Sequence, residues 1–316
     1  MKNVTLRQLR VFAAVARELS FSKAARGLHL TQPAVSMQIR QLEAAAGLPL
    51  LERLGRGTAL TEAGRELFAS ATGVDDLLRR AGETLDALRG MKAGTLRLGA
   101  VSTAKYFAPS LLAGFSRDYP GVAVRFGVAN REETVRQLAQ NEIDLAIMGR
   151  PPRGLDTAAA PFARHPLVIV AAPSHPLAGK RRIPLKRLIE EPFIIREPGS
   201  GTRASMERVF RDRGARYRAS MEVSSNETIK QAVIAGLGIA FISLHTVGLE
   251  LRTRSLAMLD VAGLPVMRDW FVVHLKNKRL SPVAAAFRGD LLAHGAAAIE
   301  RAVGFALPER RPRSAA

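Results

Sequence analysis

The stretch SKAARGLHLTQPAVSMQIRQLE, residues 22–43, contains two short helical patterns joined by only a few residues. In the second pattern Val35, Ile39 and Leu42 fall within about 60° of one another around the helix, so they predict one buried face. Thr31 is a suitable N-cap for this helix, and the proline two residues later is tolerated in a first helical turn. Two helices in such close succession indicate a helix-turn-helix.

The remaining face of the second helix is polar, and its residue types suit contacts with double-stranded DNA. In a helix-turn-helix the second helix enters the major groove with its N-terminal residues at base edges. The amide of Gln32 can pair with adenine and Arg40 can reach guanine or a phosphate, whereas Gln38 lies on the flank and is a weaker base reader. The residues predicted to contact DNA here are Ser22, Thr31, Gln32, Pro33, Ser36, Gln38 and Arg40.

The segment LLERLGRGTALTEAG, residues 50–64, predicts a short β-ribbon with a Gly-Arg-Gly tip. Such a ribbon is the wing of a winged helix-turn-helix. Arg53 and Arg56 would then lie beside backbone phosphates or in the minor groove. A wing favours DNA binding over a generic pair of packed helices.

Residues 61–90 read as one long helix with an unbroken heptad pattern. Apolar residues spaced alternately by four and three form the seam that pairs two helices. The predicted dimerisation residues are Leu67, Ala71, Val74, Leu78, Ala81, Leu85 and Leu88. The alternative is that this stripe packs on the core of its own chain.

Net charge is the outlying property of the 316-residue chain, at +19 for pH 7. This surplus favours a polyanionic partner, although a surface rich in solvated arginine is an alternative. The sequence has no apolar run long enough for a membrane-spanning helix, no signal-peptide core and no cysteine for disulfides or thiolate metal sites. We therefore expect a cytoplasmic protein without a membrane partner or a metal.

From residue 95 onward, short β-like runs alternate with helical stretches, which predicts an α/β domain with a largely parallel sheet. The predicted strands are residues 95–101, 122–128, 143–149, 166–172, 192–198, 238–244 and 269–275. The predicted helices are residues 105–117, 131–141, 202–213, 226–236 and 282–302.

Motifs of catalysis are missing from the sequence. It contains no HExxH, no GxSxG and no GxxxxGK[ST] pattern, and the Pro-Gly-Ser-Gly-Thr run at 198–202 lacks the lysine of a phosphate loop. The sequence therefore predicts no catalytic residues, no enzymatic activity and no cofactor.

Two segments do predict a binding pocket, because each has hydroxyl residues that follow a strand and open a helix. Helix N-termini aimed into one cleft would offer backbone amides to an anion, and several cations follow on neighbouring loops. The predicted effector-binding residues are Ser102, Thr103, Lys105, Asn130, Arg150, Ser200, Thr202 and Arg203. Arg153 and Arg196 are further cations nearby, for which an ordinary surface charge is the stronger interpretation. A doubly charged ligand such as a sugar phosphate, phosphoenolpyruvate or NADPH would fit.

The chain resembles the LysR-type transcriptional regulators, and within them most closely the regulators of Calvin-cycle carbon-fixation operons. The family likeness runs through LRQLRVFAAVA, the opening stretch, and GLPLLERLGRGTALTEAG. The closer likeness rests on STAKYFAPSLLAGF, GRPPR, REPGSGTR, SNETIKQAVIAGLGIAF, SLHTVGLELRT and KRLSP. Two departures are Leu51, where the family often has Phe, and Met37, where it often has Arg.

The resemblance implies an N-terminal winged helix-turn-helix, a long linker helix and a C-terminal bilobal effector domain like that of periplasmic binding proteins. The expected bounds are 1–62 for the winged helix-turn-helix with the helix-turn-helix at 21–40, 63–91 for the linker, and 92–302 for the effector domain. Lobe 1 would comprise 92–161 and 268–302, lobe 2 would comprise 162–267, and 303–316 would be a basic disordered tail.

The resulting hypothesis is a ligand-responsive activator of a carbon-fixation operon. Its expected partners are double-stranded promoter DNA, further copies of the chain in a homodimer or homotetramer, RNA polymerase and a small anionic effector. The alternatives are a regulator of another pathway, such as sulfur or aromatic metabolism, and an anion-binding protein without DNA recognition.

Overall fold

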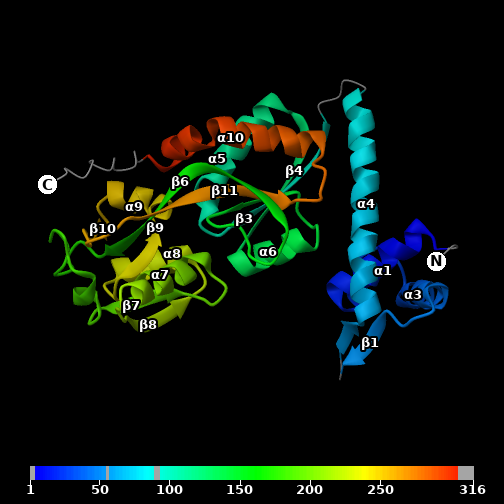
Figure 1. Cartoon of the computed structure of the whole chain (residues 1–316), viewed down its shortest axis with the longest axis horizontal. Coiled ribbons are helices and arrows are strands. Elements are labelled where there is room, and N and C mark those ends of the chain that lie inside the picture. The colour runs from blue at the N-terminus through cyan, green and yellow to red at the C-terminus, as the bar shows by residue number, and fades with distance from the viewer. Residues whose placement is uncertain (1–3, 55–56, 89–92, 305–316) are drawn as a thin grey trace. The chain divides into compact units, whose positions relative to one another are not determined.

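The computed structural model describes residues 4–54, 57–88 and 93–304 (Figure 1). Backbone contacts divide the chain into two compact units, Met1–Leu85 and Asp86–Ala316. None of the helices in the described ranges is long and apolar enough to cross a membrane.

The N-terminal unit is built from three helices, a β-ribbon and the start of a long helix. Its elements are α1 (Leu6–Glu18), α2 (Phe21–Gly27), α3 (Gln32–Ala46), β1 (Leu51–Leu54), β2 (Gly57–Leu60) and α4 (Glu62–Leu88). The predicted start of α3 is confirmed, because the Thr31 side chain accepts from the Ala34 backbone N–H and Pro33 lies in the first turn. The predicted buried face is confirmed as well, since Val35, Ile39 and Leu42 are buried in the core of this unit.

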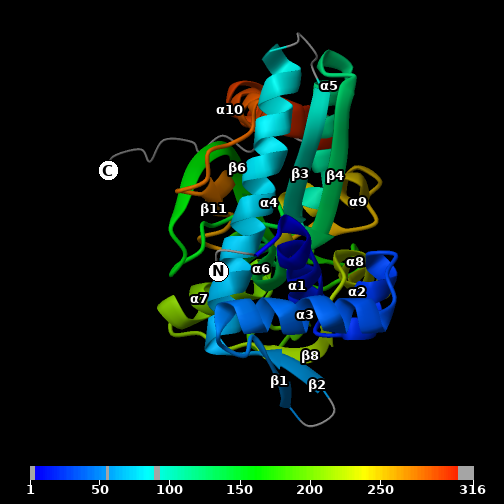
Figure 2. The same ribbon diagram turned by 90° about the vertical axis from the view of Figure 1, so that its right-hand side faces the viewer.

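The predicted wing is a two-stranded antiparallel ribbon, β1–β2, with Leu51 opposite Leu60 (Figure 2). Its base is attached to α3, because the Glu43 carboxylate accepts from the backbone N–H groups of Leu50 and Leu51 at 2.9 and 3.2 Å. Arg53 is exposed on this ribbon, whereas Arg56 lies outside the described residues.

The predicted heptad positions of α4 divide into two groups. Ala71 is buried and Leu67 is partly buried against the core of the N-terminal unit. Leu78 and Leu85 are 41% and 57% exposed, and a further leucine, Leu77, is 60% exposed beside them. The early positions therefore pack on their own chain, and the later leucines are free to meet a second helix. Val74 is half-buried and Ala81 exposed, while the side chain of Leu88 lies outside the described residues.

The C-terminal unit contains one large mixed sheet and a smaller two-stranded sheet. Its strands are β3 (Ala93–Val101), β4 (Gly121–Ala129), β5 (Leu145–Met148), β6 (Thr157–Ala171), β7 (Pro192–Arg196), β8 (Arg218–Val223), β9 (Ala240–Ser243), β10 (Ala257–Met258) and β11 (Val266–Leu275). Its helices are α5 (Ala108–Asp118), α6 (Arg131–Ala139), α7 (Gly201–Asp212), α8 (Asn226–Ile234), α9 (Gly248–Arg252) and α10 (Pro282–Val303), with 3₁₀ turns at Ala104–Tyr106, Leu185–Leu188 and Leu244–Thr246.

The expectation of a largely parallel sheet was wrong. The large sheet has the order β10-β6-β11-β5-β3-β4, with β9 also paired to β6. Only β3 with β4 and β3 with β5 are parallel in the described part of this sheet, while β6, β11, β9 and β10 add antiparallel pairs. The chain runs out along β6 and returns along β11, so these two long strands lie antiparallel side by side (Figure 1).

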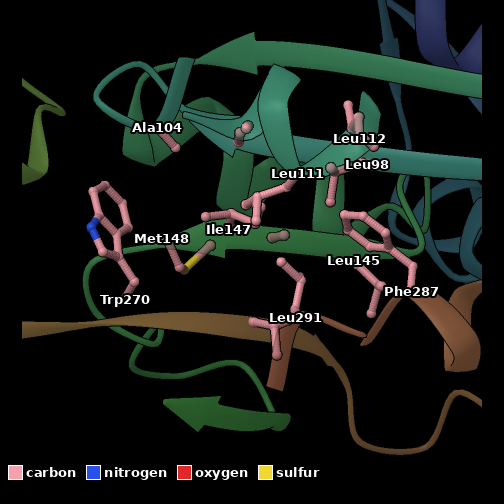
Figure 3. Close-up of a cluster of buried hydrophobic side chains, with 14 of the residues drawn as sticks. Leu98, Ala104, Leu111, Leu112, Leu145, Ile147, Met148, Trp270, Phe287 and Leu291 are labelled. Carbon is pink, nitrogen blue, oxygen red and sulfur yellow. The ribbon is translucent and has the colours of Figure 1, made fainter. Parts of the chain in front are cut away.

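Separate hydrophobic clusters occupy the two ends of the β6–β11 pair. One cluster includes Phe162 and fills the space between the sheet and the helices α5 and α10, where Leu111 and Leu291 point toward Ile147 (Figure 3). Another cluster includes Leu167 and extends to α7. The β6–β11 pair therefore links two lobes, each with a core of its own.

The sequence did not predict four elements of this unit, namely the early part of β6, the strands β8 and β10, and the helix α9. Pro161 and Pro166 interrupt the pattern of β6, and proline cannot donate to a β ladder. The structure accommodates Pro161 at a register shift of the β6–β11 pair, where Phe271 lies opposite it. The predicted helix at 105–117 is also divided, because Ala104–Tyr106 forms a 3₁₀ turn and α5 begins only at Ala108.

Candidate DNA-binding and effector sites

The outward face of α3 carries most of the residues predicted to contact DNA. Thr31, Gln32, Pro33 and Arg40 are exposed, while Ser36 and Gln38 are half-buried, as the flank position of Gln38 predicts. On α2, Ser22 is exposed and its hydroxyl donates to the Gln32 Oε1 atom at 3.1 Å. This hydrogen bond orients the Gln32 amide at the N-terminal end of α3, where a helix-turn-helix reads bases.

Met37 lies on the same face and is 52% exposed. Isolated exposed apolar side chains are common on folded proteins, so exposure alone assigns Met37 no contact.

A small cavity of about 30 Å³ lies between the two lobes of the C-terminal unit. The structure brings five of the predicted effector residues together in its lining, from segments far apart in the sequence. The lining consists of Val101, Ser102, Thr103, Arg131, Gly149, Arg150, His165, Ser200, Gly201, Thr202 and Arg268. A wider groove of about 840 Å³ shares Arg131, Gly149, Arg150, Ser200, Gly201 and Arg268 with it, and extends to Arg153 and Arg208.

Only one of the two predicted helix N-termini is present at the cavity. Ser200 is the N-cap of α7 and accepts from the Arg203 backbone N–H at 3.4 Å. The first backbone N–H groups of a helix have no partner within it, so Gly201 and Thr202 offer amides to an anion. Ser102 and Thr103 instead precede the 3₁₀ turn and cap no α-helix.

Three predicted effector residues do not line the cavity, because each has a partner elsewhere. Lys105 lies 4.0 Å from Glu227. Asn130 caps α6 by accepting from the Glu133 backbone N–H at 2.9 Å. Arg203 forms ion pairs of 2.8 and 2.6 Å with Glu207 and Glu222, and these hold its guanidinium away from the cavity.

Arg196 joins the two lobes through hydrogen bonds and does not line the cavity. Its guanidinium is buried, pairs with Glu197 at 2.7 Å and donates to Asn226 at 2.7 Å and to the Ser102 hydroxyl at 3.0 Å. Tyr106 makes a second link of this kind, donating to Glu227 on α8 at 2.5 Å. These contacts hold the two sides of the cleft together.

Arg131 and Arg268 are cavity residues that the sequence did not reveal. Arg268 lies on β11 and donates to the Gly149 carbonyl at 2.6 Å and to the Ser205 hydroxyl. Burial, and then the neighbouring charges of Arg150, Arg131 and Arg208, lower the pKa of Arg268 to about 10. Arg131 donates to the Pro151 carbonyl at 3.1 Å, and burial lowers its pKa too.

The small cavity therefore carries positive charge without an acidic side chain in the described part of its lining, whereas Glu132 and Asp269 line the wider groove. Among the described residues, Arg131, Arg150 and Arg268 form no ion pair with a carboxylate. The pKa of Arg150 is lowered by burial and by Arg208, Arg153 and Arg131, which is the effect of like charges gathered in one place. Such a site stabilises a bound anion.

Comparison with known proteins explains this combination of units. Residues 6–65 match the bacterial regulatory helix-turn-helix protein model of the lysR family, and residues 89–296 match the LysR substrate binding domain model. The RuBisCO operon transcriptional regulator of Allochromatium vinosum is 51% identical over 93% of this chain and 97% of its own length. The chain belongs to the LysR family of transcriptional regulators.

Two further relatives extend the comparison of this LysR-family chain. The HTH-type transcriptional regulator CfxR of Cupriavidus necator is 49% identical over 98% of each chain. The regulatory domain of Synechocystis CcmR, solved in complex with 2-PG, is 42% identical, covers 63% of this chain and 96% of its own, and superposes with a TM-score of 0.61. The predicted family and fold class are confirmed, and the family is one of regulators rather than enzymes.

Proposed function

We propose that this LysR-family regulator controls a carbon-fixation operon and responds to a small phosphorylated acid bound between the lobes of its C-terminal unit. Its near-full-length likeness to RuBisCO operon regulators supports the operon. One observation carries the effector class: Arg131, Arg150 and Arg268 meet at one cavity without a carboxylate partner among the described residues.

The effector would place one oxyanion group in the small cavity. The Thr202 amide at the start of α7 and the Ser102 hydroxyl would donate to it, and the three arginines would balance its charge. The rest of the ligand would extend into the wider groove toward Arg208. The related regulatory domain of CcmR was solved with 2-PG, that is 2-phosphoglycolate, a small acid with both a phosphoryl and a carboxylate group. Phosphoenolpyruvate, sugar phosphates and NADPH share the phosphoryl group.

DNA recognition would use the exposed face of α3 and the wing. The proposed contacts are Ser22, Thr31, Gln32, Pro33, Ser36 and Arg40, with Gln38 at the flank and Arg53 and Arg56 of the wing on phosphates. The exposed leucines of α4 would pair two such units, so that two recognition helices meet successive major grooves. We propose that the regulator acts as a homodimer or homotetramer and contacts RNA polymerase at the promoter.

A ligand panel tests the effector. The full-length protein is titrated with 2-phosphoglycolate, phosphoenolpyruvate, ribulose 1,5-bisphosphate, NADPH and uncharged glycerol, and the midpoint of thermal unfolding is measured. We expect at least one phosphorylated acid to raise the midpoint and glycerol to leave it unchanged. A midpoint that no anion moves would contradict the proposed site.

A pair of substitutions tests DNA recognition. Arg40→Ala and Gln32→Ala are each expected to weaken specific binding to a carbon-fixation promoter by about 5- to 150-fold, because each removes a donor at the major groove. Arg117→Ala is the matched control, since it removes an exposed positive charge from α5 in the other unit. Promoter affinity that neither α3 substitution changes would favour an anion-binding protein without DNA recognition. Equal affinity for the promoters of sulfur or aromatic metabolism would favour another pathway.

A further inference from the structure

His165 forms part of the lining of the small cavity and is itself only 3% exposed. Its Nε2 atom lies 3.0 Å from the Ser243 hydroxyl, whereas its Nδ1 atom is buried and has no hydrogen-bond partner among the described residues. A buried polar nitrogen left without a partner costs about 1–3 kcal/mol, so its persistence calls for an explanation.

The space in front of this nitrogen exists because residue 149 is glycine. A Cβ atom at Gly149 would lie 2.8 Å from the His165 Nδ1 atom, which is too close for carbon and nitrogen. Gly149 also lines the cavity and accepts from Arg268 through its carbonyl. The backbone thus leaves an opening between the imidazole and the arginines.

The imidazole ring is held in one orientation. It stacks on Trp270 with 3.9 Å between ring centroids and 15° between planes. The Trp270 indole is fixed in turn, because its Nε1 donates to the His245 Nδ1 atom at 2.9 Å. A ring held by this stack and by the Nε2–Ser243 hydrogen bond does not rotate to find another partner for Nδ1.

We propose that the His165 Nδ1–H group donates a hydrogen bond to an oxyanion oxygen of the effector and is a specificity-determining contact of this site. The proposal rests on the proposed effector site. The Ser243 hydroxyl is fully buried, and Nε2 is its only hydrogen-bond partner among the described residues. A hydroxyl that accepted from Nε2–H would leave its own proton without a partner, so the hydroxyl donates to Nε2 and the ring proton lies on Nδ1. Burial, followed by the charges of His245 and Arg268, lowers the pKa of His165 well below its ordinary value, so the ring is neutral.

This contact favours an acceptor over a donor at the floor of the cavity. An ionised phosphoryl or carboxylate oxygen accepts from Nδ1–H and lies beside the Arg268 guanidinium, which is the cross-strand neighbour of His165 in the β6–β11 ladder. A ligand hydroxyl in the same place could only accept hydrogen bonds from Nδ1–H and the guanidinium, and would find no acceptor for its own proton there. The site would therefore select ligands by an oxyanion group rather than by size.

The test compares two substitutions in the full-length protein, with 2-phosphoglycolate and inorganic phosphate as probes in titration calorimetry. His165→Phe combined with Ser243→Ala keeps a flat ring against Trp270, removes the donor, and removes the hydroxyl that would lose its acceptor. His165→Asn keeps an N–H donor near the position of Nδ1. We expect the first variant to bind 2-phosphoglycolate at least ten-fold more weakly and the second to recover part of the loss.

The chain has one tryptophan, and it lies against this ring, so its emission checks that the stack survives. His294→Phe, at an exposed position on α10, is the matched control. Wild-type affinity in both His165 variants would overturn the proposal while leaving the effector site standing. Failure of the wild-type protein to bind either probe would overturn both.

Discussion

Replacing Arg268 with methionine is expected to separate two properties that usually fall together, the stability of the ligand-free protein and its affinity for anions. Arg268 is largely buried beside Arg150, Arg131 and Arg208, and burial together with these charges lowers its pKa from the ordinary arginine value to about 10. Each pKa unit corresponds to 1.36 kcal/mol, so the folded protein disfavours this charge by about 3 kcal/mol.

The sign of this effect follows from proton binding. Between pH 10 and the ordinary pKa of arginine, the unfolded chain holds the Arg268 proton and the folded chain releases it, so stability rises with pH in that window. Below pH 10 the destabilisation is fully present, and it therefore operates at neutral pH. Methionine removes it but also removes the hydrogen bonds of the charged guanidinium to Gly149 and Ser205, each worth about 1.5 kcal/mol or slightly more. The two effects nearly cancel, so we expect the free energy of unfolding to stay within about 1 kcal/mol of the wild-type value.

Anion affinity is expected to fall sharply in the same variant. A hydrogen bond to a charged group contributes about 1.5–3 kcal/mol, which corresponds to a loss of affinity of roughly 10- to 150-fold. At a 2-phosphoglycolate concentration of about 100 times its Kd, ligand binding stabilises the wild-type protein by about 2.7 kcal/mol. A 30-fold weaker variant would gain only about 0.9 kcal/mol at that concentration.

Thermal unfolding with and without 2-phosphoglycolate, together with calorimetric Kd values, measures both quantities. Arg164→Met is the matched control, because Arg164 is exposed on β6, pairs with Asp269 and does not line the small cavity. The control should change neither quantity by much. If Arg268→Met lowered stability by 3 kcal/mol or more while keeping wild-type affinity, Arg268 would be a structural residue and the reasoning from uncompensated charge would be wrong.

Three other predictions concern separate parts of the molecule. Tyr106→Phe removes the 2.5 Å hydrogen bond to Glu227 across the cleft and should weaken effector binding about three- to ten-fold in calorimetry, because the closed arrangement loses about 1 kcal/mol. Lys278→Met removes the 2.9 Å ion pair to the buried Asp144, which keeps its 2.8 Å pair with Arg97, and should cost about 1.5–3 kcal/mol in thermal unfolding; an unchanged midpoint would contradict this. Met37→Arg should steepen the dependence of log K for DNA on log salt by about 0.9, and an unchanged slope would mean that this position does not face phosphate.

The N-terminal unit could be predicted well because its determinants are local. Thr31 and Pro33 define the start of α3 within three residues, and the spacing of Val35, Ile39 and Leu42 defines its buried face. Caps, first-turn prolines and helical periodicity act between neighbours in sequence, so reading the sequence alone captures them.

The effector cavity could be predicted only in part because its determinants are not local. Hydroxyls after strands indicated Ser102 and Ser200, but the register of two strands a hundred residues apart decides that His165 lies opposite Arg268. Sequence spacing also wrongly placed Arg203 at the cavity. Arg203 follows Ser200 closely, but its guanidinium pairs with Glu207, one helical turn further along α7. An arginine or lysine near a helix cap lines the pocket only if it is not already paired with a nearby carboxylate. The order of residues along the chain does not reveal such a pairing.

The position of the cavity on the β6–β11 pair suggests how binding reaches the rest of the regulator. His165 and Arg268 are opposite each other on the two strands that link the lobes, and Ser200 joins them from the start of α7. An anion bound by His165, Arg268 and Ser200 would touch both linking strands and the start of α7 at the same time. A ligand shifts a conformational equilibrium only through contacts that differ between the states. Contacts on the linking strands meet this condition for a change in the angle between the lobes that moves Ser200 relative to the β6–β11 pair, because such a change would alter the affinity for the anion.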